Sequence, residues 1–230
     1  MSAVLGSDKS LVLASPARRA QRKRRLDAQV RTMPIASANF PVLALLVELH
    51  VDCLDAERAI KKLRDGCRHW RLLHRGKDFD RKFPPGDVLA WASVCLSAFN
   101  RIRLMLYPGK RRSQTIAKRC AFLQKMLGNP RLEHVCTSEV RNSWEHFDER
   151  LDHVIRKPRF KSFSNISISV DRPPADTLVF RQVDAVRLTI HVLDQEIPIR
   201  PCLSEIRALN AAVVAAHDSL MDGRIVSLGA

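Results

Sequence analysis

Apolar residues recur at every third or fourth position along the first two thirds of the chain, a spacing that is typical of amphipathic helices. The pattern predicts helices at residues 38–75, 87–107, 113–127 and 131–156, separated by stretches that contain proline or glycine. The fourth segment has the most regular pattern, with apolar residues at Cys136, Val140, Trp144, Phe147, Leu151 and Val154. Four helices with one apolar face each can share a core, so the sequence predicts a helical bundle.

The pattern changes after Pro158, where apolar and polar residues begin to alternate with the period of two that is typical of strands. The alternating segments lie at 166–170, 178–182, 186–192 and 197–199, and a last amphipathic helix is predicted at 201–221. We therefore expect a mainly α fold, with an antiparallel four-helix bundle, a small C-terminal antiparallel β-meander and a final helix.

This pattern divides the chain into three parts. Residues 38–157 form the predicted bundle, and residues 158–230 form the meander and the final helix, which are expected to pack on the bundle. Residues 1–37 hold eight Lys or Arg against two Asp. Three interpretations of this arm fit: a disordered basic arm that touches nucleic acid, an organelle transit peptide, or an extension upstream of a true start at Met33. We expect the first.

Charge and cysteine content limit the classes of function. The 230 residues carry a net charge of +15, which favours polyanions such as nucleic acid, although a basic surface without such a role is also compatible with it. The six cysteines contain no CxxC pair, and Cys67, His69 and His74 do not complete a ligand set. No metal, cofactor or membrane association is expected, and a reducing, cytoplasmic compartment is the simplest interpretation.

One polar cluster stands out on the fourth predicted helix. At about 100° per residue, Arg141 and His146 are expected to flank the side of the helix that faces away from the core, with Asn142 between them. A guanidinium can hold a phosphate, and an imidazole can move a proton near neutral pH. Charged residues on an outer helix face are common, so this cluster also fits an ordinary solvated surface.

The sequence Arg141-Asn142-x-x-x-His146 resembles the signature of the HEPN superfamily, and the resemblance covers about residues 40–157. It implies a metal-independent endoribonuclease, often of toxin–antitoxin or phage-defence systems, that works as a homodimer. By position, Arg141 would bind the scissile phosphate, His146 would act as general base or acid, and Asn142 would orient one of them. The product would be a 2′,3′-cyclic phosphate.

The resemblance has one departure. Some members of the superfamily carry a tyrosine two positions after the histidine, which a partner enzyme modifies, and this chain has Asp148 there. Regulation by that route is therefore doubtful, and Asp148 is able to neutralise Arg141. The alternative is a non-catalytic HEPN-like module that dimerises or binds nucleic acid through the same polar face. Whether the protein is an enzyme thus stays open.

The chain between Asp87 and Glu133 contains no acidic residue, which supports a polyanionic partner. We expect its basic side chains to contact phosphates without reading sequence, as would suit a nucleic-acid-binding accessory factor. The phosphate-binding candidates are Lys110, Arg111, Arg112, Lys118 and Arg119. The expected partners are RNA, a second copy of the chain and an acidic antitoxin-like protein.

Overall fold

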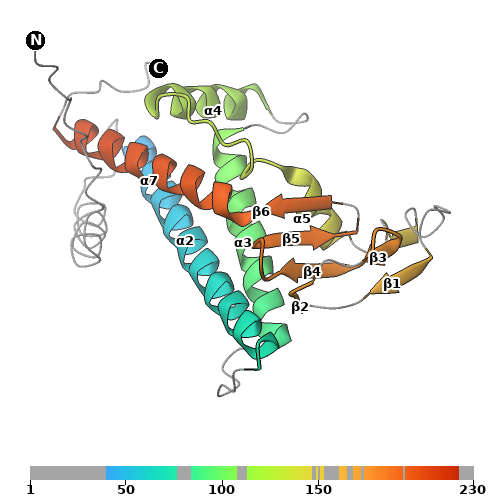
Figure 1. Ribbon diagram of the computed structural model, residues 1–230. Coiled ribbons are helices and arrows are strands. Elements are labelled where there is room, and N and C mark those ends of the chain that lie inside the picture. Colours follow the sequence, from blue (N-terminus) through green and yellow to red (C-terminus); the bar gives the residue numbers. More distant parts are fainter. Residues whose placement is uncertain are drawn as a thin grey trace, which may run out of the picture.

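The computed structural model describes residues 40–76, 84–107, 113–146, 149, 151–152, 161–164, 168–171, 174–193 and 195–222. Within these ranges the protein is mainly helical, with a small sheet region and a C-terminal helix that packs on the other helices (Figure 1). This part of the expected fold is confirmed. The arm predicted at residues 1–37 lies outside the described residues.

Four helices lie within two residues of their predicted ends. They are α2 (Phe40–His74), α3 (Pro85–Leu106), α4 (Gln114–Met126) and α7 (Ile199–Met221). The ends of α4 follow directly from its sequence. The hydroxyl oxygen of Ser113 accepts from the main-chain N–H of Ile116 at 3.4 Å, and Gly128 follows the helix with a φ of +73°, which a residue with a side chain rarely adopts.

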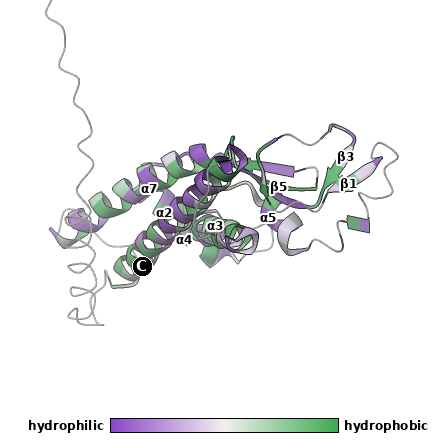
Figure 2. Cartoon of the chain, turned by 60° about the horizontal axis from the view of Figure 1, so that its bottom comes forward, coloured by the Kyte–Doolittle hydropathy of each residue, from purple (hydrophilic) through white to green (hydrophobic). Residues whose placement is uncertain are grey.

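The core lies where α2 packs along α3 and α7 (Figure 1). Leu46, Leu49 and Leu63 of α2 are fully buried, and so is Ile206 of α7. Burying one such side chain stabilises the fold by about 1.5–3 kcal/mol. Figure 2 shows hydrophobic and hydrophilic stretches alternating along α2 and α7, as the helical spacing of the sequence requires. The apolar pattern alone thus accounts for this three-helix layer.

A polar contact also joins α2 to α7 inside this core. Nδ1 of the buried His50 lies 2.7 Å from Oδ1 of Asn210, within hydrogen-bond distance. The contact fixes the position of α7 along α2, because a buried imidazole nitrogen and amide oxygen are costly to leave without each other.

The described residues do not show the predicted antiparallel four-helix bundle. Within the predicted helix 131–156, α5 (Ser138–Glu145) has eight residues, and the described residues 149, 151 and 152 are also helical. Helix α5 packs against α3, β5 and β6. Helix α4 lies across one end of α3 in Figure 1 and is tied to it by the side-chain amide of Gln124, which donates to the main-chain oxygen of Leu106 at 2.8 Å. Three long helices and a sheet therefore share the core.

The described residues of the sheet region form six short strands. They are β1 (Ser162–Ser164), β2 (Ile168–Ser169), β3 (Thr177–Val179), β4 (Arg181–Asp184), β5 (Thr189–Val192) and β6 (Gln195–Pro198). The order β4-β5-β6 is antiparallel, as expected for a meander. However, β2 pairs with β4 and β1 pairs with β3 in parallel, so the expectation of a wholly antiparallel sheet is wrong. The alternating pattern predicts strands and not their direction.

The strand predicted from residue 186 begins at Thr189 instead, and the cause is local. The carboxylate oxygen Oδ1 of Asp184 accepts from the main-chain N–H groups of Val186 and Arg187, at 2.8 and 2.7 Å. An aspartate that binds the backbone two and three residues ahead forms a turn, and Leu188 completes it with a φ of +58°. The sheet then places Val183, Ile190 and Ile197 in one buried row.

Helix α3 is the one helix among the described residues that is long and apolar enough to cross a membrane, by length and composition only. Several of its side chains, including Val88, Cys95 and Ile102, are instead fully buried within the core that α3 forms with α2. This placement is typical of the central helix of a globular domain.

Candidate functional site

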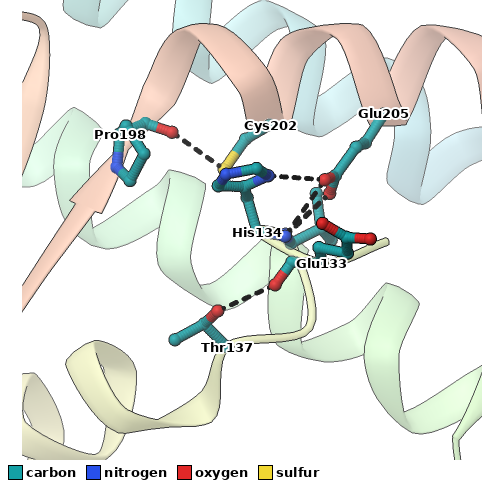
Figure 3. Close-up of polar contacts among 7 residues, drawn as sticks. Glu133, His134, Thr137, Pro198, Cys202 and Glu205 are labelled. Atoms are coloured by element: carbon teal, nitrogen blue, oxygen red, sulfur yellow. Dashed lines mark hydrogen bonds and ion pairs between the residues drawn. The ribbon is translucent and has the colours of Figure 1, made fainter. Parts of the chain in front are cut away.

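The polar cluster of the sequence lies on and just after α5, and a turn before the helix sets its position. Residues 133–136 form this turn, so the predicted helical run from residue 131 is wrong. The carboxylate of Glu205 on α7 accepts from the main-chain N–H groups of His134, at 3.0 Å, and Val135, at 2.9 Å (Figure 3). The imidazole nitrogen Nδ1 of His134 lies 2.7 Å from the same carboxylate.

This contact explains why the helix starts late. The side chain of Glu205 is 14% exposed, so its carboxylate is largely removed from water and its hydrogen bonds are correspondingly stronger. Three polar groups of His134 and Val135 converge on it, which favours the turn over a helix at this point. The helix then begins at Ser138, and a residue on α7 thereby positions α5.

The C-terminal end of α5 is fixed by a second long-range contact. The guanidinium nitrogen Nη2 of Arg181, on β4, donates to the main-chain oxygen of Trp144 at 2.7 Å. The same guanidinium lies 5.4 Å from the centre of the Trp144 ring, within the range of a cation–π contact. A cation is favourable at the C-terminus of a helix, where carbonyl oxygens lack partners within the helix. Arg181 therefore holds the C-terminal end of α5 against β4 and brings a positive charge to it.

Arg141 does not take the position that the helical wheel predicts, because it faces α3. Its side chain is half-buried and lines a small crevice with Asn100 and Arg103 of α3. The remaining lining residues are Leu96, Phe99, Val135 and Thr137. None of the described lining residues is acidic. The space is about 10 Å³, the volume that one water molecule needs, so a phosphate would enter only if these side chains moved apart.

His146 lies just beyond the helix. Its backbone has φ −104° and ψ 46°, and its N–H donates to the main-chain oxygen of Asn142 at 2.9 Å. The imidazole is 60% exposed, with Nδ1 3.8 Å from a carboxylate oxygen of Glu149. His146 is not among the residues that line the crevice at Arg141. The structure thus places Arg141 on α5 and His146 just after it, but not in one common crevice. The side chain of Asn142 is half-buried.

The basic candidates of the acid-free run lie elsewhere. Lys118 is exposed on α4, and Arg119 is half-buried on the same helix. Neither lines the crevice at Arg141. Lys110, Arg111 and Arg112 lie outside the described residues, as does Asp148.

Two arginines near α5, Arg103 and Arg181, were not predicted as site residues from the sequence. Arg103 counted only as one member of the acid-free run, and Arg181 was not distinguished from the other basic residues of the strands. The helical spacing of Arg103 from Leu96 and Phe99 places it on the inner side of α3, which is a detectable signal. For Arg181 no local signal exists, because its contact with Trp144 joins residues 37 positions apart.

The described residues contain no group of three or more His, Cys, Asp or Glu side chains that is arranged to hold a metal ion. Burial raises the pKa of the Cys67 thiol to about 12, despite the nearby Arg71. A thiol with such a pKa is a poor metal ligand near neutral pH, because the thiolate is the ligating form.

No family model matches the sequence, and neither the curated proteins nor the solved structures contain a significant match to it.

Proposed function

We propose that the protein binds RNA at α5. The observation that carries this proposal is that three half-buried arginines from three different elements converge on this one short helix: Arg103 from α3, Arg141 from α5 itself and Arg181 from β4. Guanidinium groups are well suited to phosphate because their fork of N–H donors matches two phosphate oxygens. The net charge of +15 would draw a polyanion to the protein at long range.

Among the described residues, the lining of the crevice carries two arginines and no carboxylate. The carboxylate of Glu205 on α7, which contacts the turn before α5, already accepts hydrogen bonds from the main-chain N–H groups of His134 and Val135. A bound phosphate would therefore meet N–H donors from the guanidinium groups of Arg141 and Arg103. It would have to part α3 from the start of α5 to reach all of them.

RNA cleavage is the second candidate, and the exposure of His146 favours it. An accessible imidazole can remove the proton from a ribose 2′-hydroxyl, whose oxygen then attacks the adjacent phosphorus. The bond from phosphorus to the 5′-oxygen breaks, that oxygen takes up a proton, and a 2′,3′-cyclic phosphate remains. In a homodimer, a second His146 would supply the proton. This is the activity that the HEPN resemblance implies, with Arg141 on the phosphate and Asn142 orienting the catalytic groups.

Two partner proposals accompany the site. A second copy of the chain would place another His146 at the cleavage site, and an acidic antitoxin-like protein would compete with RNA for the arginines. Light scattering at several protein concentrations tests the first. For the second, a polyanionic competitor such as heparin is expected to displace RNA from the site.

The binding proposal is tested with a fluorescent single-stranded RNA of mixed sequence, titrated with wild type, Arg141→Gln and Arg200→Gln. Arg200 is exposed at the start of α7 and matches the charge loss. We expect the affinity to fall about tenfold or more for Arg141→Gln only, since one phosphate contact and its charge are lost. Equal affinities of the two variants would reject α5 as the binding site.

The cleavage proposal is tested separately by incubating the RNA with protein in EDTA, beside His146→Ala and Arg141→Gln. We expect cleavage by the wild type that leaves cyclic phosphate ends, with a loss of at least about a hundredfold in His146→Ala at unchanged RNA affinity. Binding without cleavage by the wild type would identify a non-catalytic binding module.

A further inference from the structure

The charges of α2 are divided between its two halves. Residues 40–57 contain four acids and no Lys or Arg, whereas residues 58–75 contain seven Lys or Arg and a single acid, Asp65. The second half therefore has a net charge of +6 over 18 residues. Among the described helices, none carries a denser run of positive charge.

Five of these cations lie along one side of the helix. They follow each other by three and four positions, at Lys61, Arg64, Arg68, Arg71 and Arg75, and we call them the basic stripe. All are exposed except Arg71, which is half-buried. Ile60, Leu63 and Cys67 lie on the adjacent side of the helix, about a quarter turn from the stripe, and pack into the core. At about 1.5 Å per residue, the stripe is about 21 Å long and nearly straight.

The basic stripe contributes nothing evident to the stability of the fold. Within the described residues, none of its five side chains forms an ion pair with a carboxylate. Neighbours at three and four positions carry the same charge and repel each other. Arg58, just before the stripe, shows the contrast, because it pairs with Asp55 at 3.0 Å. A bound polyanion would relieve the repulsion within this row of like charges.

The surroundings of the stripe select among polyanions. A membrane-bound helix needs large apolar side chains exposed beside its cations. The exposed large hydrophobic residues of the described chain are Val94, Phe163 and Val186, and none is on α2. An evenly spaced, straight row of cations matches the regular spacing of phosphates along a nucleic-acid strand.

We propose that the basic stripe binds the phosphate backbone of RNA, as a second contact surface in addition to α5. The proposal rests on the proposed function only in taking RNA as the polyanion. Because the stripe offers charges and no exposed aromatic side chain, it provides affinity without sequence choice. Charge and not side-chain shape is then the requirement, so Arg64→Lys/Arg68→Lys binds like the wild type.

The test measures the affinity of the full chain for a 20-nucleotide single-stranded RNA of random sequence by fluorescence anisotropy, between about 50 and 200 mM salt. Wild type is compared with Lys61→Gln/Arg64→Gln/Arg68→Gln and with the matched control Arg187→Gln/Arg200→Gln/Arg207→Gln. All six side chains are exposed, so circular dichroism is expected to show the same helix content and melting for the three proteins.

We expect the stripe variant to bind at least about tenfold more weakly at the lower salt concentration. The slope of log affinity against log salt should also fall by about 2, at about 0.7 per lost phosphate contact with a single strand. The control should keep the slope of the wild type. An equal loss in both variants would mean that net charge alone acts, and an unchanged stripe variant would also overturn the proposal.

The α5 variant Arg141→Gln distinguishes this result from failure of the proposed function. Loss of RNA binding in Arg141→Gln with full binding by the stripe variant rejects the stripe and leaves α5 intact. Full RNA binding by Arg141→Gln with loss of RNA binding in the stripe variant rejects α5 as the binding site and supports the stripe. Retained RNA binding by the stripe variant, together with loss of its binding to vesicles of anionic lipid, would assign the stripe to a membrane and overturn the proposal.

Discussion

Arg181 and Trp144 meet at the point where α5 ends, with the guanidinium donating to the main-chain oxygen at 2.7 Å while it lies over the indole ring. One side chain of the sheet thereby binds the C-terminal end of a helix that lies far from it in the sequence. This contact and that of Glu205 with the preceding turn define both ends of the segment that carries Arg141 and His146.

Replacing Arg181 by methionine is expected to destabilise the protein by about 1–3 kcal/mol, since a half-buried carbonyl oxygen loses a charged donor and the ring loses its cation. Urea unfolding measures this change. Arg187→Met is the matched control, because its side chain is 56% exposed and 3.9 Å from the nearest carboxylate oxygen. The control should stay within about 0.5 kcal/mol of the wild type. Similar values for both variants would contradict the role of Arg181.

Glu205→Gln tests the contact between α7 and the turn before α5. The neutral amide has one acceptor oxygen in place of two, so the N–H groups of His134 and Val135 can no longer both keep a charged acceptor. We expect a loss of about 1–3 kcal/mol in the free energy of unfolding. Glu196→Gln, at a side chain that is 67% exposed, should change it by less than about 0.5 kcal/mol. Equal stability of Glu205→Gln and wild type would show that the contact is dispensable.

The buried Asp52, paired with the exposed Arg101, predicts a dependence of stability on pH. Burial raises the pKa of the Asp52 carboxyl above its usual 3.8, although the hydrogen bond and charge of Arg101 oppose the rise. The folded state then holds a proton that the unfolded state has released, so this carboxyl makes the fold less stable as pH rises from about 4 through the folded pKa. The stability of wild type relative to Asp52→Asn should therefore fall over this range. Unfolding by urea at several pH values measures it, and a rising difference would refute the assignment.

The six cysteines are free thiols, and burial governs their reactivity. It raises the pKa of both Cys67 and Cys136 to about 12 and raises those of Cys53, Cys95 and Cys202 as well. At pH 8 the thiolate fraction of a thiol with a pKa near 12 is about one in ten thousand. We expect these five thiols to react with a disulfide reagent far more slowly in the native protein than in urea. Rapid modification of Cys136 in the native state, judged against Cys136→Ser, would contradict this expectation.

The sequence predicted the parts of the fold that local patterns control. The long helices α2, α3, α4 and α7 follow from their apolar spacing, and Gly128 follows the end of α4 in one of the stretches that contain proline or glycine. The limits of α5 could not be predicted, because Glu205 and Arg181 act on it from distant positions. Strand direction was also out of reach, since the period of two is the same in parallel and antiparallel strands.

For the candidate site, the sequence placed Arg141 and His146 on one helical segment, but it predicted the wrong side of the helix for the side chain of Arg141. Val140 and Trp144 are buried as the periodicity requires, but Arg141 lies against α3 because the helix packs between α3 and the sheet. The helical-wheel prediction assumed that only one side of this helix packs against a core. The function of this segment, and its proposed partners, stay predictions.

The contact between Glu205 and residues 134–135 has a consequence for how the protein is made. A nascent chain on the ribosome exposes α5 and its arginines well before α7 has been synthesised, yet the turn that precedes α5 lacks its carboxylate until then. The region that we propose for RNA binding is therefore assembled last. A polypeptide released before α7 would carry the same positive charges without the geometry to direct them.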